Sequence, residues 1–237
     1  MIFDCHVHVE NGLQGYDLPR TTRRNIIFNY TDHYRKLRDR VTPDDVISLI
    51  LPLNSEHAFV KAEADAGRIA GLKIHSRIQQ ITSERHRDLH QALRAMPEHL
   101  PIIYDAFYFG PRLEHQPSLE GVISLAENFP ERRFVIAHAG GYEVLKYFLH
   151  LRPLSNIWYD LSLSLQYLED TSHRADLVKL VRYTDKSRIM YGSDYHYASP
   201  FQQAKVLGRI CDEAGVSADD QKRIFFENAA DLWNHPC

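Results

Sequence analysis

Short apolar runs and amphipathic stretches alternate along most of this chain. Seven runs of β-branched and aliphatic residues predict β-strands at residues 2–9, 46–53, 69–75, 101–107, 133–138, 156–161 and 188–192. The spacing of apolar residues predicts helices at residues 56–67, 84–96, 118–128, 143–151, 174–184, 201–214 and 218–233. Strands that alternate with helices, without hairpin signals, predict a parallel sheet with right-handed crossovers.

Several of the predicted strands lead directly into an ionisable residue. His75, His138 and Asp194 each stand at or just beyond the carboxyl end of an apolar run. This placement is typical of the active-site end of a parallel α/β barrel, where the loops after the strands carry the chemistry.

A closed barrel of this type has eight strands, and the pattern predicts only seven. One strand–helix unit is therefore shortened or missing between residues 53 and 69, or it lies concealed in residues 10–45. That long segment is polar, basic in places, and has a helical pattern over residues 30–38. Because it directly follows the first strand, we expect a lid over the active site within a single domain, residues 1–237. The alternative is a solvated surface excursion.

The first predicted strand has one polar and one apolar face. Asp4, His6 and His8 share a face because side chains alternate along a strand, and the residues between them are apolar. Burying three polar groups side by side costs several kcal/mol unless they are paired. A divalent metal ion is the simplest partner, since neutral imidazole is its commonest ligand. The alternative is two surface histidines on an edge strand.

The composition narrows the classes of function. The length of 237 residues suits one domain, and a net charge of −3 provides no electrostatic basis for binding nucleic acid or an anionic membrane. Three cysteines without framework spacing favour a reducing compartment, which predicts a cytoplasmic protein. We expect neither a signal peptide nor a bilayer-spanning segment, which needs ~20 apolar residues. The expected partner is a small-molecule substrate.

Five short motifs and the closing helix occur in the order of a known family. They are Asp4-Cys5-His6-Val7-His8, Gly71-Leu72-Lys73-Ile74-His75, Ala137-His138-Ala139-Gly140-Gly141, Trp158-Tyr159-Asp160-Leu161-Ser162, Tyr191-Gly192-Ser193-Asp194-Tyr195 and Ile224-Phe225-Phe226-Glu227-Asn228-Ala229-Ala230. With them, the chain resembles the amidohydrolase superfamily, in particular its amidohydrolase-related branch of small decarboxylases, hydratases, hydrolases and lactonases. The resemblance implies a distorted (β/α)8 barrel with a mononuclear or binuclear metal site. Similar proteins are commonly homodimers.

By position, the resemblance implies that His6 and His8 bind a metal ion from the first strand and Asp194 binds it from the last. Asp194 would also take the proton from metal-bound water, and His138 would polarise the substrate carbonyl or bind a second metal ion. A metal ion lowers the pKa of its water towards ~7, so this division of roles is chemically sound. Two histidines and a carboxylate suit Zn, Mn or Fe, and we expect one divalent ion, with zinc as the first choice. Asp4 would orient a ligand histidine or the loop after the last strand.

The predicted fifth strand departs from the family. It usually ends in a metal-binding histidine, but here Tyr104 or Asp105 stands near that position, and both are candidates for binding the substrate. Asp105 could be a carboxylate ligand, since Zn, Mn and Fe accept oxygen donors. Alternatively, the site binds metal weakly or not at all, as in the metal-independent lactonases of the superfamily.

Other polar residues at the strand ends are candidates for binding the substrate. Elsewhere in the superfamily a fourth-strand lysine is carbamylated, whereas an unmodified Lys73 would bind a substrate carboxylate or form an ion pair. His75 shares the strand face of Lys73, which makes it a pocket residue or a structural histidine. Arg77 and Arg112 could fork onto a carboxylate or lie solvated on the surface. His196 would face the pocket or cover the barrel mouth.

Three functional hypotheses remain. The first is a metal-dependent hydrolase that uses activated water on a C–N or C–O bond of a small, carboxylate-bearing molecule. The second keeps the barrel but changes the reaction to nonoxidative decarboxylation or metal-independent lactone opening. The third is a barrel that binds a small molecule without catalysis.

Overall fold

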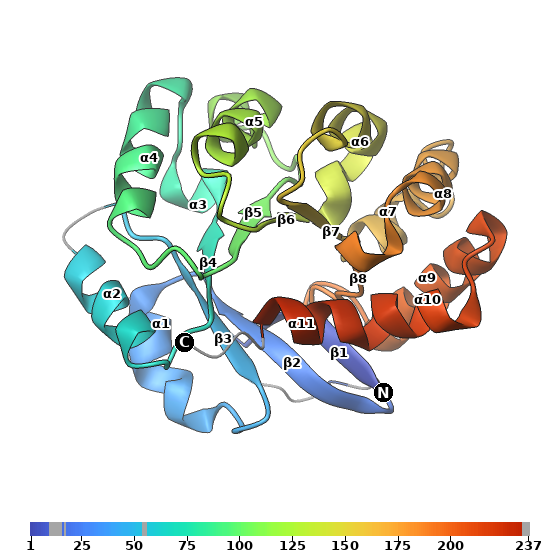
Figure 1. Ribbon diagram of the computed structural model, residues 1–237, viewed down its shortest axis with the longest axis horizontal. Coiled ribbons are helices and arrows are strands. Elements are labelled where there is room, and N and C mark those ends of the chain that lie inside the picture. Colours follow the sequence, from blue (N-terminus) through green and yellow to red (C-terminus); the bar gives the residue numbers. More distant parts are fainter. Residues whose placement is uncertain (10–15, 17, 54–55, 234–237) are drawn as a thin grey trace.

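The computed structural model describes residues 1–9, 16, 18–53 and 56–233. Within these residues, eight strands form one sheet in which each strand pairs in parallel with the next (Figure 1). The strands are β1 (Ile2–His8), β2 (Thr21–Phe28), β3 (Val46–Ile50), β4 (Gly71–Ile74), β5 (Ile102–Asp105), β6 (Phe134–Ala137), β7 (Ile157–Asp160) and β8 (Ile189–Met190).

Backbone hydrogen bonds between β1 and the segment after β8 nearly close this sheet into a barrel. The His8 N–H donates to Tyr195 O at 2.6 Å, and the Asp194 N–H donates to His6 O at 2.9 Å. The contacts that close the barrel therefore also bring Asp194 beside the two histidines of β1.

Helices lie around the outside of the barrel, mostly between successive strands (Figure 1). The α-helices are α1 (Thr31–Leu37), α2 (His57–Asp65), α3 (Ser76–Gln79), α4 (His86–Arg94), α5 (Leu119–Asn128), α6 (Val144–Leu151), α7 (Ser164–Leu168), α8 (Arg174–Tyr183), α9 (Pro200–Ala214), α10 (Ala218–Lys222) and α11 (Asn228–Trp233). Shorter 3₁₀ segments are η1 (Arg38–Arg40), η2 (Ser83–Arg85), η3 (Leu113–His115), η4 (His138–Glu143) and η5 (Lys186–Arg188), and η6 (Arg223–Glu227) is a π-helical turn. None of the helices described here has both the length and the apolar character to cross a membrane.

The alternation of side chains along β1 separates the helical layer from the barrel interior. Phe3 and Cys5 pack against the C-terminal helices, where the rings of Phe3 and Trp233 have centroids 5.9 Å apart. His6 and His8 lie on the opposite face of the strand and are also buried. The period-two pattern thus packs apolar side chains under α11 and directs both imidazoles into the barrel.

The strand that the sequence pattern did not predict is β2. It lies in residues 10–45, and with α1 it supplies the strand–helix unit that the count of seven lacked, so the described barrel has all eight strands. Within this segment β2 and α1 form barrel wall, and Tyr30 between them lines the cavity. Residues 10–15 and 17 lie outside the described residues, and the lid stays a prediction. The first half of β2, Thr21-Thr22-Arg23-Arg24-Asn25, is polar, which concealed its strand character.

The other seven predicted strands are confirmed, and the predicted helices are present with shifted ends. The predicted helix at 218–233 is divided into α10, η6 and α11, and the one at 84–96 into η2 and α4. Helices α3 and α7, of four and five residues, were not predicted because they are too short to show a helical period.

Glu63 joins α2 to the preceding helical segment through a buried carboxylate. Its side chain accepts hydrogen bonds from Tyr34, Arg38 and Arg68. Both bonds from Arg68 measure 2.8 Å. The hydrogen bonds from Arg68 are the largest cause that lowers the pKa of Glu63 from 4.5 to about 2.

We therefore expect Glu63→Gln to lower the free energy of unfolding at pH 7 by about 1.5–3 kcal/mol, the range for hydrogen bonds to a charged group. Because the folded pKa is depressed, this contribution is complete above the unfolded pKa of 4.5 and declines as the pH falls towards about 2. Urea unfolding of both proteins between pH 7 and pH 3.5 measures the difference, which should narrow below pH 4.5. The exposed Glu127→Gln is the control, and an equal loss in both variants would contradict the assignment.

Candidate active site

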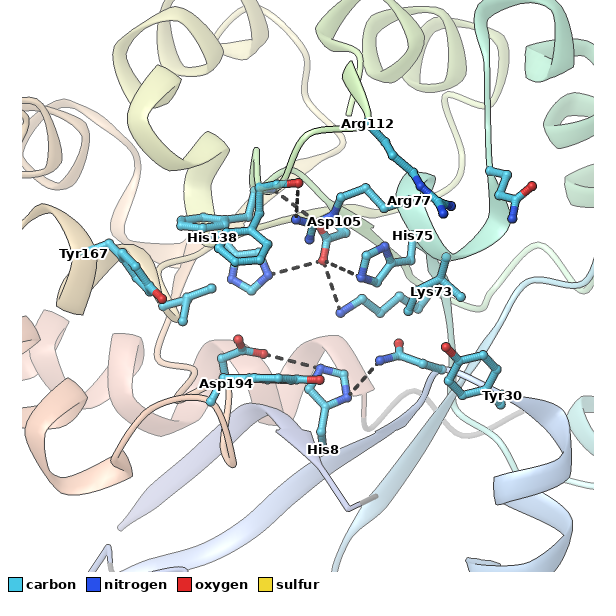
Figure 2. Close-up of a pocket in the computed structure, with 17 residues that line it drawn as sticks. His8, Tyr30, Lys73, His75, Arg77, Asp105, Arg112, His138, Tyr167 and Asp194 are labelled. Atoms are coloured by element: carbon cyan, nitrogen blue, oxygen red, sulfur yellow. Dashed lines mark hydrogen bonds and ion pairs between the residues drawn. The ribbon is translucent and has the colours of Figure 1, made fainter. Parts of the chain in front are cut away.

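The carboxyl ends of the strands open into a cavity of about 620 Å³ (Figure 2). His8 enters it from the end of β1, Lys73 from β4 and Asp105 from β5, while His138 and Asp194 follow β6 and β8. Ionisable residues from five strand ends therefore meet in one space, as the parallel topology requires.

Three possible metal-binding atoms converge at this end of the barrel. His6 Nε2 lies 3.3 Å and His8 Nε2 lies 3.4 Å from Asp194 Oδ1. All three side chains are buried, and their ligand atoms lie within 4.8 Å of one another. We call His6, His8 and Asp194 the donor triad. They are three of the four residues predicted to bind metal.

Hydrogen bonds on the far side of each imidazole decide which nitrogen faces Asp194. His6 Nδ1 lies 2.6 Å from Asp160 Oδ2, and His8 Nδ1 lies 3.2 Å from Ile27 O. Burial would raise the pKa of Asp160, but the His6 ring holds it below its usual value, so Asp160 accepts the hydrogen bond as a carboxylate. Both Nδ1 atoms then carry the proton, and both Nε2 lone pairs face Asp194. Three acceptors in this arrangement fit a divalent metal ion.

The Lys73 ammonium also reaches the donor triad. Its Nζ lies 2.9 Å from His6 Nε2 and 3.7 Å from Asp105 Oδ2. Burial lowers the pKa of His6 to about 4, and the Lys73 charge acts in the same direction, so the ring is neutral at pH 7, as a metal ligand must be. The ammonium and a metal ion would use the same lone pair of His6, so the two exclude each other there.

A second group of possible ligands consists of His6, His138 and Asp160. The Ser162 hydroxyl lies among them, 2.8 Å from Asp160 Oδ2, 3.0 Å from His138 Nδ1 and 3.2 Å from His6 Nδ1. These atoms already have hydrogen-bond partners, so the group does not need a cation. His138 is thus the one predicted metal ligand that stands outside the donor triad.

Nitrogen atoms surround Asp105 at the end of β5. Its Oδ2 lies 3.4 Å from His138 Nε2 and 3.5 Å from His75 Nε2, while Oδ1 lies 3.5 Å from Arg77 Nη2. Burial would raise the pKa of Asp105, but His75, His138 and Lys73 hold it well below its usual value. Among the described residues, Asp105 belongs to neither group of possible metal ligands, so the predicted alternative of a fifth-strand carboxylate ligand is not supported.

The backbone is unusual at two of the predicted catalytic residues. His138 has a φ of 61° and Asp194 a φ of 58°, both in the left-handed region. Residues other than glycine adopt this conformation rarely, and such residues concentrate at sites where the surrounding structure enforces a functional geometry. His138 is further held by a 3.1 Å hydrogen bond from its Nδ1 to Ser162 O.

Asp4 connects β1 to the segment after β8. Its Oδ1 accepts from the Ser193 N–H at 2.8 Å and from the His6 N–H at 3.3 Å, and its Oδ2 accepts from the Tyr16 hydroxyl at 2.7 Å. These contacts agree with the predicted role of Asp4 in orienting a ligand histidine or the loop after the last strand. Gly192 leaves room for the neighbouring His6 and Asp160, because a Cβ there would lie 2.4 Å from Asp160 Oδ1 and 3.0 Å from His6 Cβ.

Two predicted substrate-binding residues do not line the cavity. Tyr104 points away from it, and its hydroxyl accepts from the Ser118 N–H at 3.1 Å and donates to Ser118 O at 3.3 Å. The cause is strand alternation, since its neighbour Asp105 points inwards. His196 packs its ring on Tyr197 with centroids 4.5 Å apart, and of these two residues Tyr197 lines the cavity and His196 does not. These two predictions are corrected.

The remaining predicted residues, Lys73, His75, Arg77 and Arg112, all line the cavity (Figure 2). Asp160, Ser162 and Asn29 were not predicted to have a role in the site. Asp160 has the same signal as the predicted residues, a carboxylate at the end of an apolar run, and could have been found. The aromatic residues of the cavity were not predicted either; they are Tyr30, Phe107, Phe109, Tyr167 and Tyr197.

A nearly closed parallel barrel with histidines and carboxylates at the carboxyl ends of its strands is the architecture of the barrel enzymes. The amidohydrolase family model matches residues 24–234, and the chain belongs to this family. The resemblance seen in the motifs is thereby confirmed. The protein is therefore an enzyme, with hydrolysis, lactone opening and decarboxylation as candidate reactions. Its superfamily generally uses divalent metal ions.

Solved structures with the same fold have low sequence identity. A candidate 2-pyrone-4,6-dicarboxylic acid hydrolase from Pseudomonas putida is 16% identical with a TM-score of 0.66, covering 98% of this chain and 97% of its own. Dihydroorotase from Saccharomyces cerevisiae is 13% identical with a TM-score of 0.69, and the match covers 100% of this chain and 84% of that one. For 2,6-dihydroxybenzoate decarboxylase from Rhizobium the identity is 10% and the TM-score 0.64, and the match covers 98% of this chain and 97% of that one. The comparison with curated proteins returned no match. At these identities, the structural likeness establishes the fold alone.

Replacing Lys73 should reveal its relation to the metal site. If the ammonium competes for His6 Nε2, Lys73→Met will raise the affinity for Zn²⁺ about tenfold or more, because a like charge leaves the site. Competition with a chromogenic chelator measures this affinity, and the exposed Lys61→Met is the control. A lower affinity in Lys73→Met would instead mean that Lys73 contributes a ligand, as a carbamate does.

Asp160→Asn should weaken metal binding without removing a ligand. The neutral amide accepts more weakly from His6 Nδ1, and such outer partners typically contribute 10–100-fold to metal affinity. We expect about a tenfold loss for Zn²⁺ in the same chelator assay, with the exposed Asp170→Asn unchanged. Unaltered affinity in Asp160→Asn would show that the His6 ring needs no such support.

Proposed function

We propose that the protein is a metal-dependent hydrolase that cleaves a C–N or C–O bond of a small, carboxylate-bearing molecule. The donor triad carries this proposal, because His6 Nε2 and His8 Nε2 lie 3.3 and 3.4 Å from Asp194 Oδ1. Zinc is our first choice of metal, since a site of two imidazoles and one carboxylate is typical of catalytic zinc. The cytoplasmic location and the homodimer predicted above belong to the same proposal.

A bound divalent ion would polarise the scissile carbonyl and activate the attacking water. His6 and His8 would hold the ion through Nε2. Asp160 and Ile27 O fix the two rings for this purpose from the opposite side.

Asp194 is positioned to accept the proton that the attacking water loses. Burial would raise its pKa, but His6, His8 and His138 lower it, so the carboxylate is ionised at neutral pH. Since Asp194 also lines the cavity, it can return this proton to the leaving group.

His138 is suited to stabilise negative charge on the substrate. Burial lowers its pKa, but the hydrogen bond to Asp105 and the charge of Asp194 outweigh burial and raise it. When both ring nitrogens carry a proton, Nδ1 donates to Ser162 O, and the Nε2–H on the Asp105 side can donate to the carbonyl oxygen of the substrate.

Arg77 and Arg112 support the assignment of a carboxylate-bearing substrate. Both line the cavity, and a guanidinium group forks onto a carboxylate through two parallel N–H groups. Lys73 also lines the cavity and adds a third positive charge.

Elemental analysis and a substrate panel test this proposal together. We expect about one equivalent of Zn, Mn or Fe in the purified protein, lost in His6→Ala. Asp194→Asn should lower kcat on a panel of carboxylate-bearing lactones and cyclic amides by roughly 10²–10⁴-fold, the usual contribution of a general base. Circular dichroism should show that both variants remain folded.

The exposed His150→Ala is the matched control and should keep both metal and turnover. Reaction in ¹⁸O-labelled water identifies the chemistry, since hydrolysis places the label in the product and decarboxylation releases carbon dioxide without consuming water. Full activity of His6→Ala or Asp194→Asn would refute the mechanism.

A metal-independent lactonase is the second candidate, favoured by one observation. Lys73 Nζ lies 2.9 Å from His6 Nε2, so an ammonium already supplies positive charge at the donor triad. This enzyme would open lactones after exhaustive chelation, whereas the metal-dependent hydrolase would lose its activity.

A further inference from the structure

Five aromatic side chains line the cavity, and we call Tyr30, Phe107, Phe109, Tyr167 and Tyr197 the aromatic rim. They come from the segments after four different strands, β2, β5, β7 and β8. Four of them expose about half of their surface: 46% for Tyr30, 63% for Phe109, 51% for Tyr167 and 55% for Tyr197. Large apolar side chains gathered at one opening mark a binding site for an apolar group.

The aromatic rim continues down towards the catalytic groups. Phe107 meets the His138 ring edge-on with centroids 5.6 Å apart, and it packs on Tyr167 at 5.4 Å. Tyr197 meets the His8 ring edge-on at 5.8 Å. Rings of the aromatic rim therefore contact His138, a predicted catalytic residue, and His8 of the donor triad. A flat group bound between these rings would lie next to the proposed catalytic groups.

The charges of the cavity select an anion rather than a cation. Three cationic side chains, Lys73, Arg77 and Arg112, outnumber the two carboxylates, Asp105 and Asp194, and a bound divalent ion would increase this excess. This balance argues against the other ligand that aromatic side chains commonly bind, a quaternary ammonium group.

The positive and aromatic groups are close neighbours. The Arg77 guanidinium lies 5.7 Å from the centroid of the Phe109 ring and donates to Phe109 O at 3.3 Å. Arg112 comes from the loop after β5 that also carries Phe109, and Arg77, Arg112 and Tyr167 all line the cavity (Figure 2). A ligand that carries a ring next to a carboxylate can therefore contact both kinds of group.

We propose that the substrate is a small planar aromatic carboxylate, with its ring held by the aromatic rim and its carboxylate by Arg77 and Arg112. This inference names the substrate class of the function proposed above and rests on that function for the identity of the site. An aliphatic carboxylate would leave the rim without a role, and an uncharged arene would leave the arginines without one.

Three probes of similar size separate ring from charge: benzoate, cyclohexanecarboxylate and benzamide. Isothermal titration calorimetry on the purified protein measures each dissociation constant. We expect benzoate to bind at least fivefold more tightly than cyclohexanecarboxylate, which lacks the planar ring, and at least tenfold more tightly than benzamide, which lacks the charge.

Two variants assign these preferences to residues. Tyr167→Leu should reduce the preference for benzoate over cyclohexanecarboxylate to less than twofold while keeping the preference over benzamide. Arg112→Gln should reduce the preference for benzoate over benzamide while keeping the preference over cyclohexanecarboxylate. Tyr183→Leu, at an exposed tyrosine that does not line the cavity, and Arg87→Gln on α4 are the matched controls and should retain both preferences.

Equal binding of the three probes, no binding of benzoate, or unaltered preferences in Tyr167→Leu would overturn the inference. Its failure is distinguishable from that of the proposed function. Metal content and hydrolysis without any preference for an aromatic ring would refute the substrate class alone. Selective benzoate binding by a protein that neither holds metal nor hydrolyses would support the substrate class and refute the reaction.

Discussion

The hydrogen bond between His6 Nδ1 and Asp160 Oδ2, at 2.6 Å, is the interaction on which the site depends most. It joins the first strand to the seventh and leaves the Nε2 lone pair of His6 facing Asp194. Without it, either nitrogen of the ring could carry the proton, and the donor triad would lose one of its three acceptors. The bond in turn needs close packing between β1 and β7. This explains why the residue at position 192, which contacts both His6 and Asp160, is a glycine.

The balance of charge at the strand ends follows from the same arrangement. The lone pairs of His6 and His8 and the carboxylate of Asp194 together require a positive charge nearby. The Lys73 Nζ, 2.9 Å from His6 Nε2, provides one. Lys73 is also 3.7 Å from Asp105, where the family usually has a metal-binding histidine. A carboxylate at this position gives the lysine an alternative partner, so an ion at the donor triad could displace the ammonium without leaving it unpaired in a buried site. The fifth-strand departure therefore alters the partner of Lys73 and leaves the donor triad intact.

The sequence predicted most of the barrel from simple periodicities, whereas the resemblance to the family added Asp194 to the two histidines of the first strand. Alternation along β1 was sufficient to place Asp4, His6 and His8 on one face, and the apolar runs were sufficient for seven strands. Strand β2 was missed because the polar residues of its first half hide the signal. Tyr104 was misassigned because adjacent strand residues face opposite ways, and a one-residue uncertainty at a strand end reverses inside and outside. The aromatic rim was missed because its members belong to loops, where no period relates a residue to its direction.

These two outcomes reflect a division within the molecule. The residues that we propose for the chemistry are attached to strand ends, where the backbone hydrogen bonds of the barrel fix them to within a narrow range of positions. The aromatic residues that we propose to recognise the substrate lie on the loops after those strands and have much larger exposed surfaces, as Phe109 at 63% and Tyr167 at 51% show. The loops can change without disturbing the barrel hydrogen bonds, so relatives with the same fold can differ in the molecules they bind. For this chain, the reaction must therefore be inferred from the strand ends, and the identity of the substrate from the surfaces that its own loops present.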